Sequence, residues 1–392
     1  MKNDLTFKKT IVVGAGAMGI GIAQVLSQAG ATVFLYDIDL AGVKKALEKL
    51  EKVMERLVVK GRLERPESRE ILKRITPIEA LEKAEGAQVV IEAISENIEL
   101  KRDLFQRLED LLPADTIFAT NTSSLSIASL AKGLNHPERL IGIHFFNPAA
   151  LMPLVEIIPS MATGPEIVSG CKSWLTQMGK SPVVAKDSPG FIVNRVARAF
   201  YGEAMNIYEE GIASPDTIDW AMTSIGKFKM GPFLLMDFIG QDINYSVSES
   251  VWTQFYFEPR FRPNISQKRL VEQGWLGRKT GRGFYTYEKG SAVSNPIKDE
   301  ALGNSILERI LALLINEALS ALGDRLCTLE DLETAMVKGV NYPIGLIEWA
   351  KKIGPDKILQ ILKDLLDHTG DGRYRPTALL KDWVTKGKLE IK

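Results

Sequence analysis

The chain has 392 residues, of which 45% are hydrophobic and 25% charged, so it has enough material for two or three globular domains. Lysine plus arginine and aspartate plus glutamate number 49 each, and this zero net charge argues against a broad nucleic-acid-binding or membrane-binding surface. The polar start and the lack of a long apolar run predict neither a signal peptide nor a membrane span. Cys171 and Cys327 lack metal-ligand spacing, so we expect reduced thiols, no metal and a cytoplasmic location.

The first motif is a glycine-rich turn between a predicted strand and a predicted helix. A short aliphatic strand is followed at once by Gly14-x-Gly16-x-x-Gly19, which opens an apolar helix. Glycines at these positions permit a tight turn and close approach to a pyrophosphate at the helix N-terminus. Asp37 ends the next predicted strand, where its carboxylate can bind ribose hydroxyls and would repel a 2′-phosphate. The segment therefore predicts a dinucleotide site that prefers NAD to NADP.

Helices and strands alternate in the segment that follows. Residues 40–74 carry apolar side chains every third or fourth position, which predicts two helices, the second starting at Pro66. Further strands are predicted at 88–93, 116–120, 140–145, 154–158 and 183–185. This alternation predicts an α/β fold, a Rossmann-type doubly wound sheet over residues 1–186.

Polar residues follow two of these strands, in the segments 93–96 and 121–124. Ligands of an open α/β sheet bind beyond the carboxyl ends of its strands, so both loops are candidate ligand sites. Serine and threonine after a strand also cap helices, as Ser124 or Ser126 would before a helix at 127–133. The sequence leaves both roles open.

His144 is one of three histidines and lies at the end of a predicted strand. Glu156 follows twelve residues later among aliphatic residues, where a buried carboxylate without a partner would be costly. Adjacent strands lie about 4.8 Å apart, so the two side chains can meet, and an imidazole paired with a carboxylate is a good general base. A structural pair in the core is the alternative. Beside a nicotinamide site without a catalytic lysine or cysteine motif, we favour catalysis, the oxidation of an alcohol.

After Lys186 the strand pattern gives way to helical patterns. We predict one helical domain at 187–288, beginning with a long helix at 191–210, then a linker and a second helical domain at 299–392. Three segments of the two domains match in the same order: 194–204 with 308–318, 216–222 with 330–336, and 231–237 with 342–348. These matches favour a duplication whose copies pack on each other as an internal pseudo-dimer.

Asn194 would lie about one turn into the first of these helices. An asparagine among apolar helix residues is locally unfavourable, so either a ligand contact or a buried amide tie would explain it.

Five motifs occur in the order seen in the 3-hydroxyacyl-CoA dehydrogenase family, which the chain resembles over residues 8–288. They are Gly14–Gly19, Asn121–Ser124, His144–Pro148, Pro189–Arg195 and Lys279–Tyr285. The remainder resembles a second, divergent copy of the family's C-terminal helical domain, as in its tandem-domain members. The resemblance implies NAD-dependent oxidation of an L-(S)-3-hydroxyacyl-CoA to a 3-ketoacyl-CoA, and the reverse reaction.

The resemblance also implies a role for each matching residue. His144 would be the general base on the 3-hydroxyl group, and Glu156 would orient it. Ser123 would bind the substrate oxygen, and Asn194 would hold the thioester side of the substrate. Contacts with NAD would come from Gly14, Gly16, Ala17, Met18, Gly19, Asp37, Glu96, Lys101, Asn121, Asn147 and Lys279. Lys60 is a candidate for binding the phosphates of CoA.

The second helical copy has Glu308 where the first has Asn194, so we expect one active site per chain. The protein would be a monomer with an internal pseudo-dimer, or a homodimer. We expect a small acyl-CoA substrate, with a separate enoyl-CoA hydratase or thiolase as a plausible pathway partner.

Other functions remain open at this point. A short substrate such as 3-hydroxybutyryl-CoA is expected, and 3-hydroxyadipyl-CoA or another medium-chain thioester is the alternative. A β-hydroxyacid dehydrogenase would share the first 20 residues but use a lysine base, and a non-enzymatic NAD-binding relative would lack turnover.

Overall fold

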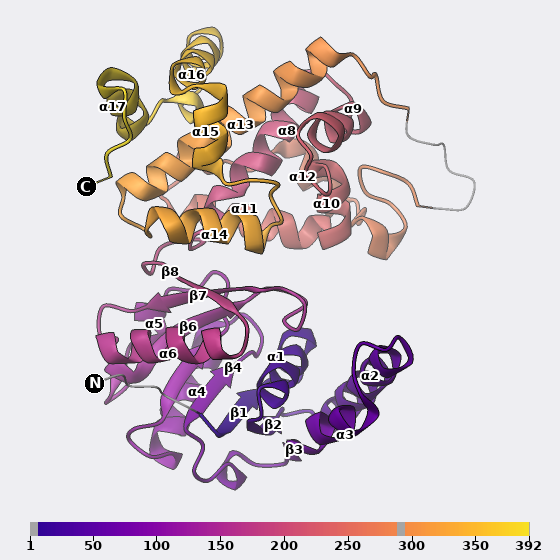
Figure 1. Cartoon of the computed structure of the whole chain (residues 1–392), viewed down its shortest axis with the longest axis vertical. Coiled ribbons are helices and arrows are strands. Elements are labelled where there is room, and N and C mark those ends of the chain that lie inside the picture. Colours follow the sequence, from indigo (N-terminus) through magenta and orange to yellow (C-terminus); the bar gives the residue numbers. More distant parts are fainter. Residues whose placement is uncertain (1–6, 288–294, 392) are drawn as a thin grey trace. The chain divides into compact units, whose positions relative to one another are not determined.

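The computed structural model describes residues 7–287 and 295–391, and the chain divides into two compact units between Ser188 and Pro189 (Figure 1). Residues 288–294 of the predicted linker and the first six residues, which bear on the predicted lack of a signal peptide, lie outside the described residues. In the described part, no helix has both the length and the apolar composition needed to cross a bilayer.

The first unit is built on an eight-stranded sheet in the order β3-β2-β1-β4-β5-β6-β7-β8. Its strands are β1 (Lys9–Val13), β2 (Thr32–Tyr36), β3 (Ile75–Ile78), β4 (Val89–Glu92), β5 (Ile117–Thr120), β6 (Leu140–Phe145), β7 (Leu154–Pro159) and β8 (Ser181–Val184). All neighbours pair in parallel except β6 and β7, which are antiparallel. The chain reverses direction across the sheet between β1 and β4, so the predicted doubly wound fold is confirmed.

The edge strand β3 is an addition to the strands predicted from the sequence. It contains Pro77, which cannot donate a ladder hydrogen bond, and only Ile75 and Ile78 of its four residues are buried. A strand that contains proline is tolerated at a sheet edge, but the proline makes such a strand difficult to predict from the sequence.

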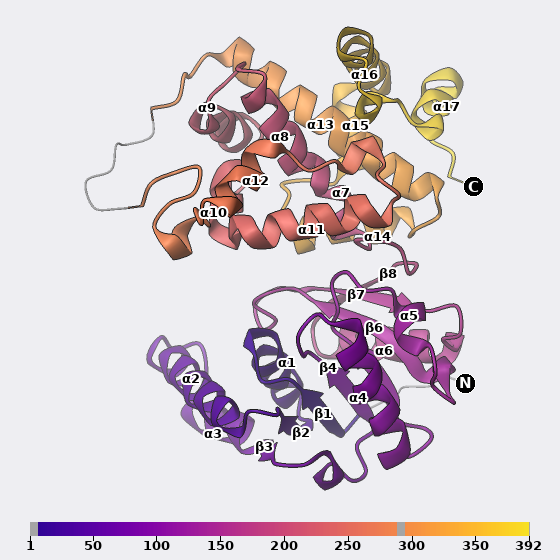
Figure 2. The same ribbon diagram turned by 180° about the vertical axis from the view of Figure 1, so that it is seen from behind.

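Helices cover both faces of this sheet. They are α1 (Ala17–Gln28), α2 (Leu40–Val59), α3 (Arg65–Lys73), α4 (Ile98–Leu111), α5 (Ile127–Ala131) and α6 (Pro165–Gln177), with short 3₁₀ turns η1 (Leu81–Lys83) and η2 (Pro137–Arg139). The α2–α3 pair extends beyond the β3 edge (Figures 1 and 2). As predicted, Pro66 lies in the first turn of α3, where its missing N–H costs no helical hydrogen bond.

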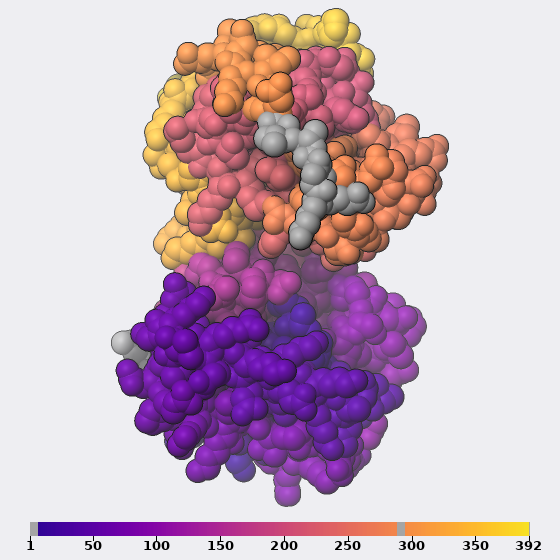
Figure 3. Space-filling model, turned by 90° about the vertical axis from the view of Figure 1, so that its right-hand side faces the viewer, coloured from indigo at the N-terminus to yellow at the C-terminus, as the bar shows by residue number. Residues whose placement is uncertain are grey.

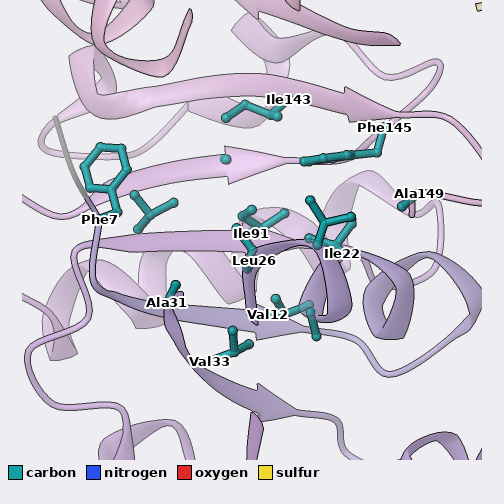
Figure 4. Close-up of a cluster of buried hydrophobic side chains, with 14 of the residues drawn as sticks. Phe7, Val12, Ile22, Leu26, Ala31, Val33, Ile91, Ile143, Phe145 and Ala149 are labelled. Atoms are coloured by element: carbon teal, nitrogen blue, oxygen red, sulfur yellow. The ribbon is translucent and has the colours of Figure 1, made fainter. Parts of the chain in front are cut away.

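The core beneath α1 is aliphatic. Val12, Ile91 and Ile143 come from three strands of the sheet and lie close to Ile22 and Leu26 of α1 (Figure 4). All five are fully buried, and burial of each such side chain contributes about 1.5–3 kcal/mol to stability. This packing holds the start of α1 against the carboxyl ends of the strands.

The described residues of the second unit form helices and loops, with isolated bridges near Arg282 and no strand. Its helices are α7 (Val193–Val196), α8 (Arg198–Glu209), α9 (Pro215–Trp220), α10 (Pro232–Ile239), α11 (Gln241–Gln254), α12 (Ile265–Glu272), α13 (Glu300–Gly323), α14 (Leu329–Gly339), α15 (Leu346–Ile353), α16 (Pro355–Thr369) and α17 (Ala378–Lys386). Short turns are η3 (Ala221–Ile225, π-helical), η4 (Pro259–Phe261), η5 (Arg278–Thr280) and η6 (Gly372–Tyr374).

The single long helix predicted at 191–210 is wrong, because α7 ends at Val196 and α8 begins at Arg198. The Arg198 Nε donates to the carbonyl oxygen of Asn194 at 3.0 Å, which is the acceptor that the Arg198 backbone N–H would use in a continuous helix. A side chain therefore replaces a helical hydrogen bond at the break.

Equivalent helices in this unit start 114 residues apart. Pro215 and Leu329 begin α9 and α14 (329 minus 215), and Pro232 and Leu346 begin α10 and α15. The predicted match of 231–237 with 342–348 is therefore wrong by three residues, and Gly231 corresponds to Gly345. The other two predicted matches have the observed spacing.

The α7–α8 segment and the α13 helix pack together through reciprocal ion pairs. Arg195 Nε lies 2.7 Å from Glu317 Oε1, and Arg309 pairs with Glu203. Residues 195 and 309 are 114 apart, as are 203 and 317, so each contact is repeated with the partners exchanged. Such exchange is the pattern of a two-fold interface. Figure 3 shows the rose segments of the first half of this unit packed directly against the yellow segments of its second half.

Candidate active site

The glycine-rich turn after β1 is shaped for a ligand. Gly14 has φ 106°, and a Cβ there would lie 2.4 Å from the carbonyl oxygen of Ala93. A Cβ on Gly19 would lie 1.7 Å from the carbonyl oxygen of Gly14, whereas one on Gly16 would meet no atom within 4 Å. Two glycines are thus required by packing, and the third keeps the backbone open at the start of α1. The first-turn N–H groups of α1, including those of Ala17 and Met18, have no intrahelical acceptor, which suits a pyrophosphate.

Asp37 follows β2, and its carboxylate is hydrogen-bonded to this turn. Its Oδ2 accepts a hydrogen bond from Ala15 N at 2.7 Å, and its Oδ1 accepts one from Asp39 N at 3.1 Å. A carboxylate has about four acceptor positions, so further acceptor capacity remains for ribose hydroxyls. The residues present therefore fit an NAD molecule.

Glu96 organises the loop after β5. Its Oε1 accepts hydrogen bonds from Thr122 Oγ1 at 2.6 Å, Ser124 Oγ at 2.9 Å and Ser123 N at 3.1 Å. Burial alone would raise the pKa of Glu96, but the ammonium of Lys101 and these hydroxyl donors outweigh it and hold the pKa below its usual range. Glu96 is therefore a fixed anion at the end of the sheet.

Of the two roles that the sequence left open for this loop, helix capping belongs to Ser126, which accepts from Ser129 N at the start of α5. Ser124 donates to Glu96, and the ligand role of the loop stays a prediction. Ser123 is half-buried at the carboxyl end of β5.

His144 and Glu156 face each other directly on the antiparallel strands β6 and β7. His144 Nδ1 lies 2.8 Å from Glu156 Oε2, and the Glu156 side chain is 0% exposed. A carboxylate only accepts, so Nδ1 carries the hydrogen and Nε2 is the basic nitrogen. This tautomer and orientation are those that a general base at the sheet end requires.

Asn121 links the loop after β5 to the strand of the histidine. Its Oδ1 accepts a hydrogen bond from Phe145 N at 2.8 Å, and its backbone N donates to Glu92 O at 2.8 Å. Asn147 is exposed just beyond β6 and precedes a cis peptide bond to Pro148.

The first unit thus gathers most of the predicted site residues at one end of its sheet. The glycine turn follows β1, Asp37 follows β2, Glu96 follows β4, Ser123 follows β5, and His144 lies near the end of β6. These strands are mutually parallel, so their carboxyl ends share one edge.

Lys60 lies elsewhere, and Lys101 lies behind Glu96. Lys60 is exposed at the far end of α2, about 30 Å along that helix from its start after β2. Lys101 is buried at 1% exposure, and its ammonium is directed at Glu92 (2.6 Å) and Glu96 (3.1 Å). Direct contact of Lys101 with NAD stays a prediction.

Asn194 and Lys279 belong to the second unit. Asn194 is half-buried in α7, and Lys279 Nζ pairs with Asp242 at 2.6 Å. The loop that follows Lys279 is anchored on the buried Asp237, which accepts from Phe284 N and Tyr285 N at 3.0 Å each.

Sequence reasoning missed Glu92, which lies at the centre of the hydrogen bonds behind the site. The available signal was the same as for Glu156, a carboxylate within an aliphatic run, here Val89-Val90-Ile91-Glu92-Ala93. Within residues 7–287 and 295–391, no group of three His, Cys, Asp or Glu side chains is placed to bind a metal ion.

Comparisons with known proteins agree with this geometry. The family model described as the NAD binding domain of 3-hydroxyacyl-CoA dehydrogenase matches residues 9–188, and the C-terminal domain model of the same family matches residues 190–287 and 306–392. The 3-hydroxyadipyl-CoA dehydrogenase of Escherichia coli is 34% identical, over 94% of this chain and 96% of that protein. A probable 3-hydroxybutyryl-CoA dehydrogenase of Bacillus subtilis is 40% identical, over 73% of this chain and 99% of that protein.

Among solved structures, that of a 3-hydroxybutyryl-CoA dehydrogenase from Escherichia coli has a TM-score of 0.91 and 32% identity, covering 97% of this chain and 99% of that chain. The predicted family, enzyme class and cofactor are confirmed. The chain belongs to the 3-hydroxyacyl-CoA dehydrogenase family, whose members are NAD-dependent oxidoreductases, and its first unit is the NAD-binding domain of that family.

Proposed function

We propose that this protein oxidises short-chain L-3-hydroxyacyl-CoA thioesters, such as 3-hydroxybutyryl-CoA, with His144 as the general base. The observation that carries the proposal is the buried pair of His144 with Glu156 at the sheet end that also carries the dinucleotide turn. NAD, when bound, supplies the hydride acceptor for C3 of the substrate.

The residues of this chain would handle the proton and the substrate. His144 Nε2 takes the proton of the 3-hydroxyl group, and the carboxylate of Glu156 stabilises the imidazolium that forms. Ser123 donates a hydrogen bond to the substrate oxygen, and Asn194 holds the thioester side. The NAD contacts of Glu96, Asn121, Asn147 and Lys279 and the CoA contact of Lys60 are part of the same proposal.

Substitution of His144 by glutamine tests this assignment. His144→Gln is expected to retain NADH binding and to lose nearly all turnover of acetoacetyl-CoA, because acid–base help is worth about 10²–10⁴ in rate. The matched control is His136→Gln, since His136 also lies 3.1 Å from a carboxylate but is exposed. Turnover of His144→Gln within tenfold of the wild type would refute the role.

A dicarboxylic substrate is the second candidate. The E. coli relative that aligns with nearly the whole chain is named 3-hydroxyadipyl-CoA dehydrogenase, which supports a six-carbon substrate with a second carboxylate. Comparison of kcat/KM for acetoacetyl-CoA, 3-ketohexanoyl-CoA and 3-ketoadipyl-CoA with NADH decides between them. The highest value for acetoacetyl-CoA supports the short-chain proposal, and free acetoacetate should not react.

We also propose that residues 187–288 and 299–392 are duplicated helical domains, and that the second copy replaces a contact between subunits. The exchanged ion pairs of Arg195 and Arg309 and the two separate matches to one domain model support this. A chain ending at about residue 290 should dimerise or aggregate in light scattering, because the α8 face would lose its partner. A stable, active and monomeric truncation would count against the proposal.

Four further statements stay predictions. The site occurs once per chain, because Glu308 replaces Asn194 in the second copy. The protein acts in the cytoplasm as a monomer or homodimer, and a separate enoyl-CoA hydratase or thiolase works beside it.

A further inference from the structure

A buried carboxylate at the end of β4 has no role in the reaction proposed above. Glu92 is 0% exposed, and its Oε1 accepts from Lys101 Nζ at 2.6 Å and from Ile94 N at 2.7 Å. Its Oε2 accepts from Thr120 Oγ1 at 2.6 Å, and Thr120 is its register partner on β5. A charge in the dry interior is tolerated only with such partners.

Lys101 connects this carboxylate to the site. Its ammonium, one turn into α4, lies between Glu92 Oε1 and Glu96 Oε2, at 2.6 Å and 3.1 Å. One cation therefore serves two carboxylates, and without it these would repel each other in a region of low dielectric. The same ammonium is 1% exposed, so little of it is left to meet a ligand directly.

From Glu96 the hydrogen bonds continue into the turn that carries Ser123. Glu96 Oε1 accepts from Ser123 N and from Thr122 Oγ1, which in turn accepts from Leu125 N at 3.0 Å. Thr122 N also donates to Thr120 Oγ1 at 3.2 Å, so the turn is tied to Glu92 by a second route. The position of the Ser123 backbone thus depends on charges buried behind it.

We propose that Glu92 and Lys101 are positioning residues for the reaction: their buried ion pair fixes the Glu96 carboxylate and the Ser123 turn against cofactor and substrate. Lys101 acts through Glu96, whose carboxylate its ammonium holds in place. The proposal rests on the proposed function only in assigning Ser123 to the substrate oxygen; the effect on Glu96 and NADH affinity does not depend on it.

A double-mutant cycle with NADH titration and steady-state kinetics tests the proposal. Lys101→Met keeps the length and burial of the side chain but leaves two carboxylates without their cation, and Glu92→Gln leaves a buried ammonium beside an amide. Each single variant is expected to raise the Kd for NADH and to lower kcat on the order of tenfold to a hundredfold. The double variant removes both buried charges, and its kcat should be at least tenfold higher than that of Lys101→Met.

The control is Lys83→Met, since Lys83 forms an exposed ion pair with Glu79 in the same unit. Its Kd for NADH and its kcat should match those of the wild type. Thermal unfolding of every variant separates a local loss from global unfolding. If Lys101→Met does not fold, Thr120→Val removes one hydroxyl from Glu92 and should raise the Kd severalfold.

Two results would overturn the proposal. One is wild-type NADH affinity and kcat in a folded Lys101→Met or Thr120→Val protein. The other is a double variant no better than Lys101→Met, which would show that the loss does not come from the unpaired charge of Glu92. Failure of the proposed function gives a different result, because His144→Gln would then keep its turnover whatever the outcome of this cycle.

Discussion

Replacement of Glu156 by glutamine should abolish most of the turnover while leaving the cofactor site intact. Glutamine has almost the same shape as glutamate, so it can keep a hydrogen bond to the imidazole, but it removes the negative charge 2.8 Å from His144 Nδ1. When His144 has taken the substrate proton it is an imidazolium in a buried site, and in the variant this imidazolium has no counter-ion.

The magnitude follows from the geometry. Two unit charges whose centres are about 4 Å apart attract by about 4 kcal/mol at an effective dielectric constant of about 20. A factor of ten in rate corresponds to about 1.36 kcal/mol, so complete loss of this attraction would cost nearly three orders of magnitude. The amide dipole of glutamine recovers part of it, and we expect kcat to fall about 10²- to 10³-fold.

The assay is NADH oxidation with acetoacetyl-CoA, followed by absorbance. The KM for NADH should not change, because Glu156 contacts the histidine and not the dinucleotide turn. Glu138→Gln is the control, since it removes the carboxylate from the exposed His136 at an almost equal distance of 3.1 Å. A kcat for Glu156→Gln within tenfold of the wild type, in a protein of unchanged thermal stability, would show that the charge is not needed.

Three other predictions concern the cofactor and the helical unit. Asp37→Ser should narrow the preference for NADH over NADPH at least tenfold, measured as the ratio of kcat/KM values, and an unchanged ratio would contradict the assignment. Burial raises the pKa of Asp219 from 3.8 to about 7, so the folded state keeps a proton that the unfolded state loses. The free energy of unfolding should therefore fall by about 4 kcal/mol as pH rises from about 4 to above 7. Measured by urea unfolding, Asp219→Asn should not show this dependence on pH. Glu317→Gln removes the buried carboxylate that Arg195 and Arg260 share, leaving the buried Arg195 only the more exposed Asp324, and should cost about 3–5 kcal/mol of stability. Glu55→Gln in an exposed pair should cost at most about 1 kcal/mol.

The features that the sequence predicted well depend on local rules. The glycine turn and Asp37 are close in sequence, and their spacing alone places them at neighbouring strand ends. The meeting of His144 with Glu156 follows from two consecutive strands in antiparallel register. In each case one short segment contains nearly all the information.

The features that the sequence did not predict depend on distant partners. Lys101 is in a charged helical segment, and only the fold shows that this position points inward to Glu92 and Glu96. At the break between α7 and α8, the Arg198 guanidinium donates to Asn244 O and Ser248 Oγ, which are 46 and 50 residues away and which a helical pattern does not reveal.

The three-residue error in aligning the helical copies has a similar origin. Matching Pro232 to Pro343 looks natural in sequence, but the structural requirement is a glycine beside a carboxylate. A Cβ on Gly231 would lie 2.3 Å from Asp219 Oδ1, and one on Gly345 would lie 1.8 Å from Glu333 Oε2. Contacts 12 residues away in sequence therefore define the alignment.

The two copies keep the same scaffold but differ at the positions assigned to ligands. Asp219 accepts from Phe233 N and Leu234 N in the first copy, and Glu333 accepts from Ile347 N and Glu348 N at the equivalent start of α15 in the second.

These carboxylates, like the exchanged ion pairs, satisfy backbone or buried charged groups that would otherwise cost stability. Asn194 is the position of the first copy that we assign to the thioester, and the second copy has Glu308 in its place. Glu308 pairs with Lys357 on the outer side of its own copy, so a negative charge now occupies the position equivalent to the thioester contact. This difference is the physical reason to expect a single catalytic site in a chain with two helical copies.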